Sequence, residues 1–380
     1  MLEDVGMRSV GLFAGIGGFE LGLQRAGIVP DLLCEYWEPA SEILKSRFDA
    51  EVVGDIRELR SIPKVDVVTA GFPCTDLSQV GRTAGIEGSE SGLVREAFRL
   101  IEDAASTWVV LENVPNMLSL RGGSAMTYIA DWFEERGWDW AYRTIDSQHF
   151  GLRQRRRRVF LVASQGEDPR TVLFAEDAGP TIARANHSAY GFSWTEGNRG
   201  VGWGDGVTPT LKGGSKVGIA SPPAIWRIDG EPGRAIMRPS VRAGERLQGF
   251  RAGWTEGSKD GVRWKMVGNA VSVPVAAWIG RGLTSPGDPL DVDRRALRPG
   301  DRWPSAAASM GGVRESWSLS DRPIQATPPS TLSGLIDRHG GTPLSFGATK
   351  GFYSRLRASS LRVRDDFKTA LVDHLESFQY

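Results

Sequence analysis

The chain has few of the residues that build disulfide or metal frameworks. It contains two cysteines, Cys34 and Cys74, and four histidines without metal-ligand spacing, so we expect neither a disulfide scaffold nor a metal site. No stretch approaches the roughly 18 apolar residues of a membrane-spanning helix, and the N-terminus has no charged region followed by an apolar run. We therefore expect no membrane association and a cytoplasmic location.

The chain also lacks an excess of charge of either sign. Lys and Arg total 46, as do Asp and Glu, so the formal net charge at pH 7 is zero. Any surface that binds nucleic acid must then be a local patch. The 40% hydrophobic and 24% charged residues are ordinary for a globular protein, and 380 residues suffice for one large domain and a smaller one.

Apolar runs and helical periodicity alternate along the first 165 residues. Strands are expected at residues 8–14, 31–35, 65–71, 108–111, 140–145 and 159–163. Helices are expected at residues 19–26, 39–48, 93–104 and 122–136. Strands separated by helices of this length pair in parallel through right-handed crossovers. The sequence therefore predicts an α/β fold with a doubly wound, mostly parallel sheet.

A glycine-rich turn, Phe13-Ala14-Gly15-Ile16-Gly17-Gly18, follows the first expected strand. Glycines at a strand-to-helix turn allow positive φ, and the helix N-terminus behind them offers unpaired N–H groups to a polar cofactor. The spacing differs from the dinucleotide pattern, which disfavours a nicotinamide enzyme, and a simple tight turn is the alternative. Glu35 ends the next strand, where an acidic residue accepts hydrogen bonds from ribose hydroxyls. The ring of Tyr36 or Trp37 is suited to stack on a purine, whereas Asp55 is either a further polar group at this edge or a solvated turn residue.

Cys74 follows the apolar stretch 65–69 in the run Ala70-Gly71-Phe72-Pro73-Cys74. A side chain at this point enters a loop at the carboxyl edge of the sheet, where open α/β sheets place their chemistry. The pattern therefore makes Cys74 a candidate nucleophile. The alternative is a small buried hydrophobic residue, because free cysteine is buried more often than it reacts.

Two later segments carry charge into the expected sheet. Glu112 ends a buried apolar strand, where a carboxyl group either holds a proton or grips a ligand; a helix cap or surface position is the alternative. Four consecutive arginines, Arg155 to Arg158, enter the strand at 159–163. Alternation puts Gln154, Arg156 and Arg158 on one face of that strand, suited to an active site, although such runs are usually solvated.

In order along residues 8–283, these segments resemble the motifs of the cytosine-5 DNA methyltransferases of bacteria and phages. The matching motifs are Phe13-Ala14-Gly15-Ile16-Gly17-Gly18-Phe19, Gly71-Phe72-Pro73-Cys74, Glu112-Asn113-Val114, Gln154 with Arg156 and Arg158, Glu245-Arg246-Leu247-Gln248-Gly249-Phe250, and Gly268-Asn269-Ala270-Val271. The resemblance implies the S-adenosylmethionine-dependent methyltransferase fold with a second, smaller target-recognition domain. It also implies S-adenosylmethionine as cofactor, S-adenosylhomocysteine as product and no metal.

The resemblance assigns roles to individual residues. The implied cofactor-binding residues are Phe13, Ala14, Gly15, Gly18, Glu35, Tyr36, Asp55, Ile56, Pro73, Asn269, Ala270 and Val271. The implied catalytic residues are Cys74, Glu112, Arg156 and Arg158. The implied DNA contacts are Ser78, Arg82, Gln154 and Lys212, with 78–92 as a loop that closes over DNA.

The implied reaction adds the Cys74 thiolate to C6 of a flipped-out cytosine, so that C5 becomes able to take the methyl group. Glu112 would hydrogen-bond N3 and the exocyclic amine, and Arg158 would reach O2 and position Glu112. Two departures from the family concern details. Gly11 stands where the family often has an acidic residue, and Thr75-Asp76-Leu77 replaces the commoner Gln-x-Phe.

By position, we expect residues 1–165 to form the catalytic and cofactor-binding domain and 166–236 the target-recognition region, in which the tryptophans would alternatively form a small core of their own. Residues 237–283 would end the recognition domain and return to the catalytic domain. Residues 284–380 would begin with a linker and form an extension packed on the small domain, ending in a helix at 365–378.

The expected partner is double-stranded DNA, bound by a monomer that is associated with the nucleoid in a bacterial host, with a possible cognate restriction endonuclease. Two alternatives stay open. A tRNA cytosine-5 methyltransferase would share the same core, and a catalytically silent DNA-binding protein would be expected to lose Cys74, Glu112 or the cofactor loop, none of which is lost.

Overall fold

The chain forms two compact units in a computed structural model that describes residues 6–72, 91–104, 106–180, 187–194, 201–213, 222–231 and 233–378. The first unit comprises residues 1–146, 157–181 and 271–325, and the second comprises residues 147–156, 182–270 and 326–380. Each unit therefore combines segments that lie far apart in the sequence.

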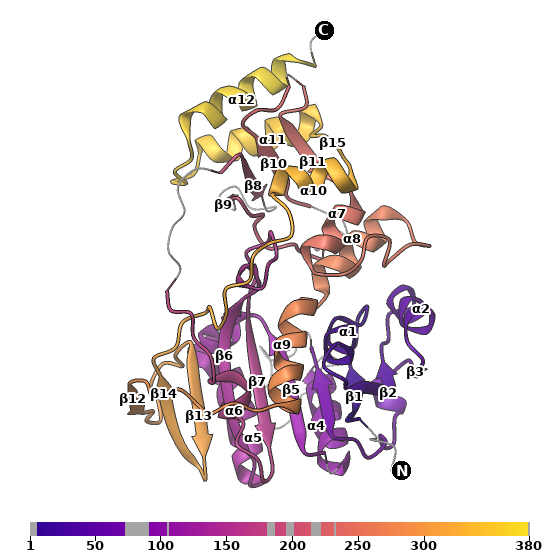
Figure 1. Cartoon of the computed structure of the whole chain (residues 1–380), viewed down its shortest axis with the longest axis vertical. Helices are drawn as coiled ribbons and strands as arrows, with labels where there is room; N and C mark the ends of the chain where they lie inside the picture. Colours follow the sequence, from indigo (N-terminus) through magenta and orange to yellow (C-terminus); the bar gives the residue numbers. More distant parts are fainter. Residues whose placement is uncertain are drawn as a thin grey trace. The chain divides into compact units, whose positions relative to one another are not determined.

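The first unit is built on a ten-stranded sheet (Figure 1). Its strands, in spatial order, are β12 (Arg294–Ala296), β14 (Val313–Trp317), β13 (Ala306–Met310), β6 (Asp139–Asp146), β7 (Arg157–Ser164), β5 (Trp108–Asn113), β4 (Val67–Ala70), β1 (Arg8–Leu12), β2 (Val29–Cys34) and β3 (Glu51–Val53). The strands from β5 to β3 pair in parallel. β2 lies on one side of β1 and β4 lies on its other side, so the direction in which successive strands are added to the sheet reverses between β1 and β4. Open α/β sheets bind ligands at such a reversal.

The remaining strands of this sheet pair in antiparallel. β7 runs antiparallel to both β5 and β6, and β13 and β14 extend the sheet in the same manner beyond β6. The predicted α/β fold is confirmed, but parallel pairing does not extend to β6 and β7. The physical reason is that the connection over residues 147–156 is shorter than the dozen or so residues that a parallel crossover needs.

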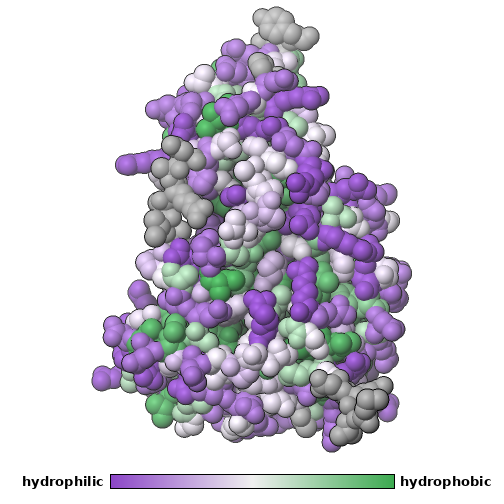
Figure 2. Space-filling model, viewed as in Figure 1, coloured by the Kyte–Doolittle hydropathy of each residue, from purple (hydrophilic) through white to green (hydrophobic). Residues whose placement is uncertain are grey.

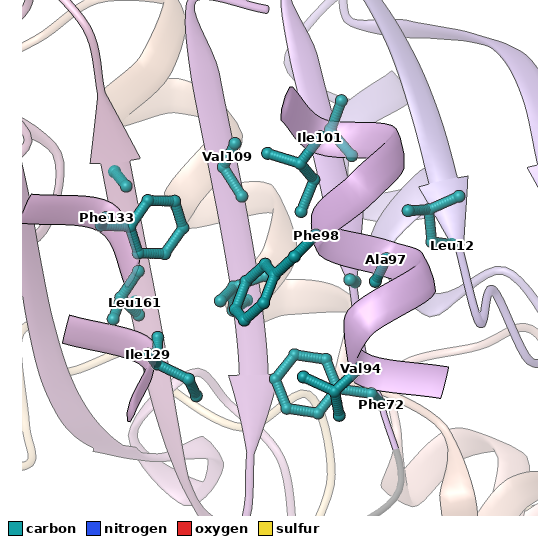
Figure 3. Close-up of a cluster of buried hydrophobic side chains, with 14 of the residues drawn as sticks. Leu12, Phe72, Val94, Ala97, Phe98, Ile101, Val109, Ile129, Phe133 and Leu161 are labelled. Atoms are coloured by element: carbon teal, nitrogen blue, oxygen red, sulfur yellow. The ribbon is translucent and has the colours of Figure 1, made fainter. Parts of the chain in front are cut away.

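Helices cover both faces of the large sheet. They are α1 (Gly18–Gln24), α2 (Glu38–Arg47), α4 (Ser91–Ala104), α5 (Ser124–Glu135), α6 (Arg170–Leu173) and α9 (Val273–Thr284), with short 3₁₀ turns η1 (Ile56–Glu58), η2 (Pro115–Leu118) and η3 (Leu120–Gly123). α4 and α5 pack on one face, where Phe98 of α4 stacks on Trp132 of α5 at a centroid distance of 4.3 Å. The buried residues Val94, Ala97, Phe98 and Ile101 recur at helical spacing, which explains why this segment is a helix and which side it buries (Figure 3).

α1 and α9 lie side by side on the opposite face, although α1 starts within the first sequence motif and α9 follows the last one (Figure 1). Their contact depends on missing side chains. A Cβ at Gly22 of α1 would overlap Ala276 of α9, and a Cβ at Gly18 would overlap the carbonyl oxygen of Val271. Phe19 of α1 meets Phe160 of β7 edge to face, with centroids 6.2 Å apart. The late motif segment is thereby tied to the first helix of the chain.

The second unit contains a five-stranded antiparallel sheet. Its strands, in spatial order, are β15 (Gly341–Pro343), β11 (Ile236–Pro239), β10 (Ala224–Arg227), β8 (Ala189–Trp194) and β9 (Val201–Asp205). Its helices are α7 (Val241–Leu247), α8 (Asp260–Asn269), α10 (Leu332–His339), α11 (Phe346–Arg357) and α12 (Asp365–Glu376), with the 3₁₀ turn η4 (Ser147–His149). Phe192 and Trp226 of the sheet pack against Phe352 of α11 and Phe367 of α12, so the tryptophan-rich segment and the C-terminal helices share one core.

The observed division differs from the expected boundaries in the C-terminal extension. Residues 284–325 belong to the first unit, because β13 pairs with β6 and Trp303 packs against the core of the large sheet. Only residues 326–380 join the second unit, where they add β15 and three helices. The helix expected at 365–378 is α12, and it buries Phe367 and Leu371. The extension thus has two halves, each of which completes a different core.

Among the residues that the structure describes, no helix is long and apolar enough to cross a membrane. On the face shown in Figure 2, hydrophilic side chains are interspersed with smaller hydrophobic areas.

The close approach of α1 and α9 predicts a specific sensitivity. Gly22→Ala should destabilise the protein by about 1–3 kcal/mol, because the added methyl group meets Ala276 and lies 2.7 Å from the backbone nitrogen of Ala277. The matched control is Gly92→Ala in α4, where a Cβ meets none of the described residues within 4 Å and the better helix propensity of Ala should raise stability by about 0.5–1 kcal/mol. Chemical denaturation measures both, and equal effects at the two positions would contradict the packing argument.

Candidate active site

The loop between β1 and α1 adopts the strained backbone of a ligand cradle. Phe13, Gly15 and Gly17 have positive φ angles of 55°, 58° and 81°. Such angles suit glycine but cost energy at Phe13, so the surrounding structure must hold this residue in place. One such restraint is the hydrogen bond from the amide of Ala14 to the carbonyl oxygen of Cys34, at 3.0 Å.

Glu35 fixes the same loop through its side chain. Its two carboxylate oxygens accept hydrogen bonds from the amides of Gly15 and Trp37, each at 2.8 Å. Burial raises the pKa of Glu35, and these two hydrogen bonds oppose the rise. A carboxylate has about four lone-pair sites, so Glu35 retains acceptor capacity for ribose hydroxyls after it has tied the loop to the end of β2.

The neighbouring strand ends supply an exposed ring and a second carboxylate. The side chain of Tyr36 is 75% exposed, which leaves its ring available for stacking. Asp55 caps η1 by accepting from the amide of Arg57 at 3.0 Å, and it also pairs with the guanidinium of Arg57, which lowers the pKa of Asp55. Ile56 is buried beside it. With the glycine loop, these groups fit a cofactor that contains a nucleoside.

Glu112 and Arg158 meet at the ends of β5 and β7. Nε of Arg158 lies 2.9 Å from Oε1 of Glu112, and both side chains are largely buried. A Cβ at Gly71 would lie 3.8 Å from the other carboxylate oxygen. The structure therefore brings this ion pair next to the end of β4.

The chain leading to Cys74 is anchored at Phe72. The ring of Phe72 is buried in the α4 side of the core and is drawn close to Val94 in Figure 3. Its carbonyl oxygen accepts a hydrogen bond from Nδ2 of Asn113 at 3.1 Å. Asn113 links the Glu112 strand to this point, a role the sequence did not indicate. The predicted residues Pro73, Cys74, Ser78 and Arg82 lie outside the described residues.

Comparison with known proteins decides the family. The protein family described as "C-5 cytosine-specific DNA methylase" matches residues 7–188 of this chain. The Type II methyltransferase M2.BsuMI of Bacillus subtilis (strain 168) is 42% identical over 388 aligned positions, which cover 96% of this chain and 97% of that protein. The chain belongs to the C-5 cytosine-specific DNA methylases. It is therefore an enzyme, a DNA cytosine-5-methyltransferase.

More distant relatives agree with this assignment. The Type II methyltransferase M.MspI of Moraxella sp. is 25% identical, over 72% of this methylase and 70% of its own length. Among solved structures, the S. pombe Dnmt2 methyltransferase aligns with a TM-score of 0.55 at 17% identity, covering 73% of this chain and 98% of that one. That structural likeness supports the methyltransferase fold.

The late-motif residues of the methylase divide between the units. Val271 lies in the first unit, against Gly18 at the start of α1. Asn269 and Ala270 belong to the second unit, at the end of α8. There, a Cβ at Gly268 would overlap the backbone of Lys212, and burial lowers the pKa of Lys212. Lys212 is thus packed against the late motif by its own backbone.

Arg156 and Gln154 differ from their expected roles. The side chain of Arg156 is buried and donates to the carbonyl oxygens of Leu211, Gly268 and Ala270 at 2.9–3.2 Å. Gln154 is fully buried, donates to the carbonyl oxygen of Leu247 at 3.1 Å and accepts from the amide of Leu211 at 2.7 Å. Because these groups are occupied by backbone partners, the structure favours a structural role over contact with a base or with DNA.

Glu20 is a buried acidic residue that the motif analysis did not select. It lies in the first turn of α1 and is 1% exposed, and burial raises its pKa to about 7. The sequence signal that could have indicated its burial is its position between the apolar residues Phe19 and Leu21 in an amphipathic helix. Its neighbours Gly11 and Thr69 come from β1 and β4, so its environment depends on tertiary structure.

Glu20 should make the stability of this methylase depend on pH. Its folded pKa of about 7 lies above the ordinary value of 4.5, so the folded state binds more protons between these values. The unfolding free energy should therefore fall as pH rises from about 4.5 to 7, by up to about 3 kcal/mol from this group. Glu20→Gln should remove that slope and be the more stable protein at pH 8 in denaturant titrations. A stability difference from wild type that stays constant between pH 5 and pH 8 would refute the assignment.

The buried arginine gives a second test. Arg156→Leu removes a donor from three buried carbonyl oxygens, of which that of Ala270 keeps Nε2 of Gln248 as a second donor, and should cost about 3 kcal/mol. Arg157→Leu is the matched control, because the side chain of Arg157 is 52% exposed and its ion pair with Asp321 is worth about 0–1 kcal/mol. If Arg156→Leu abolished methyl transfer without lowering thermal stability, the structural role would be wrong.

Proposed function

We propose that this methylase transfers a methyl group from S-adenosylmethionine to C5 of a flipped-out cytosine in a specific duplex DNA sequence, through a covalent bond between Cys74 and C6 of the base. The observation that carries the proposal is the Glu112–Arg158 ion pair beside Gly71, at the strand end from which the chain continues to Cys74. A thiol, a carboxyl group and a guanidinium are the groups that this addition requires.

The cofactor site of the proposal lies on the neighbouring strand ends. Phe13, Ala14, Gly15 and Gly18 would form the cradle, and Glu35 would accept hydrogen bonds from ribose hydroxyls. The exposed ring of Tyr36 would stack on the adenine, next to Ile56 and Asp55, while Pro73 and Val271 would complete the pocket in the first unit. When bound, S-adenosylmethionine supplies an electrophilic methyl group.

Cytosine C5 is a weak nucleophile, and the proposed role of Cys74 is to activate it. Addition of the thiolate to C6 forms a C–S bond and moves the electrons of the C5–C6 double bond toward C5, with charge developing at N3. Glu112 in its protonated form would hydrogen-bond N3 and stabilise that charge. Arg158 holds Glu112 in place and would contact O2 of the base.

After methyl transfer, C5 still carries its proton. Removal of this proton, with water as acceptor, and expulsion of the Cys74 thiolate would restore the double bond and release 5-methylcytosine. The base must leave the duplex for these steps, because C6 is otherwise inaccessible within the stack. Ser78, Arg82 and Lys212 would contact the DNA while the cytosine is extruded from the duplex.

The proposed substrate is duplex DNA, since the family is that of the C-5 cytosine-specific DNA methylases and the relatives M2.BsuMI and M.MspI are named Type II methyltransferases. We further propose that the enzyme acts as a monomer in the cytoplasm, associated with the nucleoid, and accompanies a cognate restriction endonuclease. The second unit, extended by residues 326–380, is proposed to read the target sequence.

Methyl transfer to two nucleic acids tests the substrate. The enzyme is incubated with labelled S-adenosylmethionine and either a duplex DNA library or total tRNA. Label should enter DNA, and bisulfite sequencing of the library should then reveal one recurring sequence around the modified cytosine. Label in tRNA alone would replace the DNA proposal, and no label in either, without S-adenosylmethionine binding, would overturn it.

The covalent mechanism predicts unequal roles for the two cysteines. Cys74→Ser should lower the methylation rate by at least about 10³-fold, and Glu112→Gln by about 10²-fold or more. Cys34→Ala is the matched control and should retain activity, because Cys34 is buried and burial raises its pKa to about 12. Duplex DNA with 5-fluorocytosine at the target blocks the final elimination, so a denaturation-resistant complex should form with wild type and Cys34→Ala. A complex that also formed with Cys74→Ala would disprove the role of Cys74.

A further inference from the structure

Glu20 has a carboxyl group in an unusual position for the first turn of α1. Its Oε1 reaches back over β1, where a Cβ at Gly11 would overlap it, and lies 3.5 Å from Oγ1 of Thr69 on β4. Its Oε2 is buried and has no hydrogen-bond partner within the described part of the chain. The absence of a side chain at position 11 thus creates the space that the carboxyl group fills.

This arrangement is unfavourable for stability alone. A buried carboxyl oxygen without a donor carries an uncompensated desolvation cost, and Glu35 nearby adds repulsion of like charge. An apolar side chain of similar size would avoid both costs. Residues that violate packing rules in this way are concentrated at functional sites. Within the described part of the chain, the charge at Glu20 is therefore uncompensated, as it would be at a site for a charged ligand.

The position of Glu20 identifies the chemistry of that partner. The carboxyl group lies against Gly11 of β1, two residues before the strained Phe13, and so is close to the end of the strand from which the glycine loop starts. Glu35, which binds the amide of Gly15, lies close enough to interact electrostatically with Glu20. A cationic group bound at the loop would offset both the burial of Glu20 and its repulsion by Glu35.

We propose that Glu20 is a positioning residue whose carboxylate, delivered from α1 over Gly11, retains the α-ammonium group of the amino-acid portion of the cofactor. This inference rests on the proposed use of S-adenosylmethionine. It accounts for the departure at position 11, where the family often has an acidic residue: the acid is supplied from the helix and the strand position is vacated for it.

Two ligands separate this role from a general effect on the site. S-adenosylhomocysteine carries the α-ammonium group, whereas 5′-methylthioadenosine has the same nucleoside and thioether but no amino-acid portion. Calorimetric titration of the full-length protein should show that Glu20→Gln weakens S-adenosylhomocysteine binding about 10-fold and changes 5′-methylthioadenosine binding less than about 2-fold. Equal weakening of both ligands, or of neither, overturns this inference.

A relocated carboxylate provides the rescue. In Gly11→Asp/Glu20→Ala, the acid returns to the strand and the space it needs is vacated, so S-adenosylhomocysteine affinity should recover to within about 3-fold of wild type, while Glu20→Ala alone stays about 10-fold weaker. Failure of the double variant to recover, with its melting temperature unchanged from that of Glu20→Ala, counts against the inference. Wild-type protein that binds neither ligand would instead overturn the proposed function.

Discussion

Parallel pairing of five neighbouring strands is the constraint on which the candidate site depends. Because β5, β4, β1, β2 and β3 run in one direction, their carboxyl ends meet at one edge of the sheet. Each end delivers a different chemical group: a glycine loop after β1, a carboxylate after β2, another after β3, Phe72 after β4 and Glu112 on β5. The groups are distant in sequence, and strand direction alone brings them together.

This edge could be predicted from the sequence because its information is local. An apolar run followed by Phe-Ala-Gly, Cys-Glu-Tyr or Leu-Glu-Asn identifies a strand and the group at its end. The resemblance to the family rests on the order of six motifs, which include the first and the last of these segments. The sequence could not specify what Arg156 binds. Alternation along the strand predicts the face on which the side chain of Arg156 lies. It does not predict the partners of that side chain, because the carbonyl oxygens of Leu211, Gly268 and Ala270 come from remote segments. The same limit applies to the extension, since nothing local indicates that residues 306–308 pair with β6.

Buried charges in this protein fall into two kinds, and the difference is informative. Arg143 is fully buried, yet it pairs with Asp177 and donates to the carbonyl oxygens of Leu173 and Ser320, so its charge is compensated within the first unit. Arg156 donates instead to backbone carbonyl oxygens of the second unit. Such residues lock elements together and require no ligand. Glu20 is of the other kind, because one of its oxygens is buried and none of the described residues donates to it.

Glu35 shows how structural and binding roles combine in one side chain. Its carboxylate holds the amide of Gly15, and thereby the positive φ angles of the loop, before any ligand arrives. A ligand hydroxyl that binds the same carboxylate would find the loop already in its strained conformation. Binding would then not require the loop to become ordered, which makes the binding free energy more favourable. Loss of Glu35 would then act twice, through the missing hydroxyl contact and through the released loop. Glu20 lacks this second function, and its effect should therefore be confined to the charge it supplies.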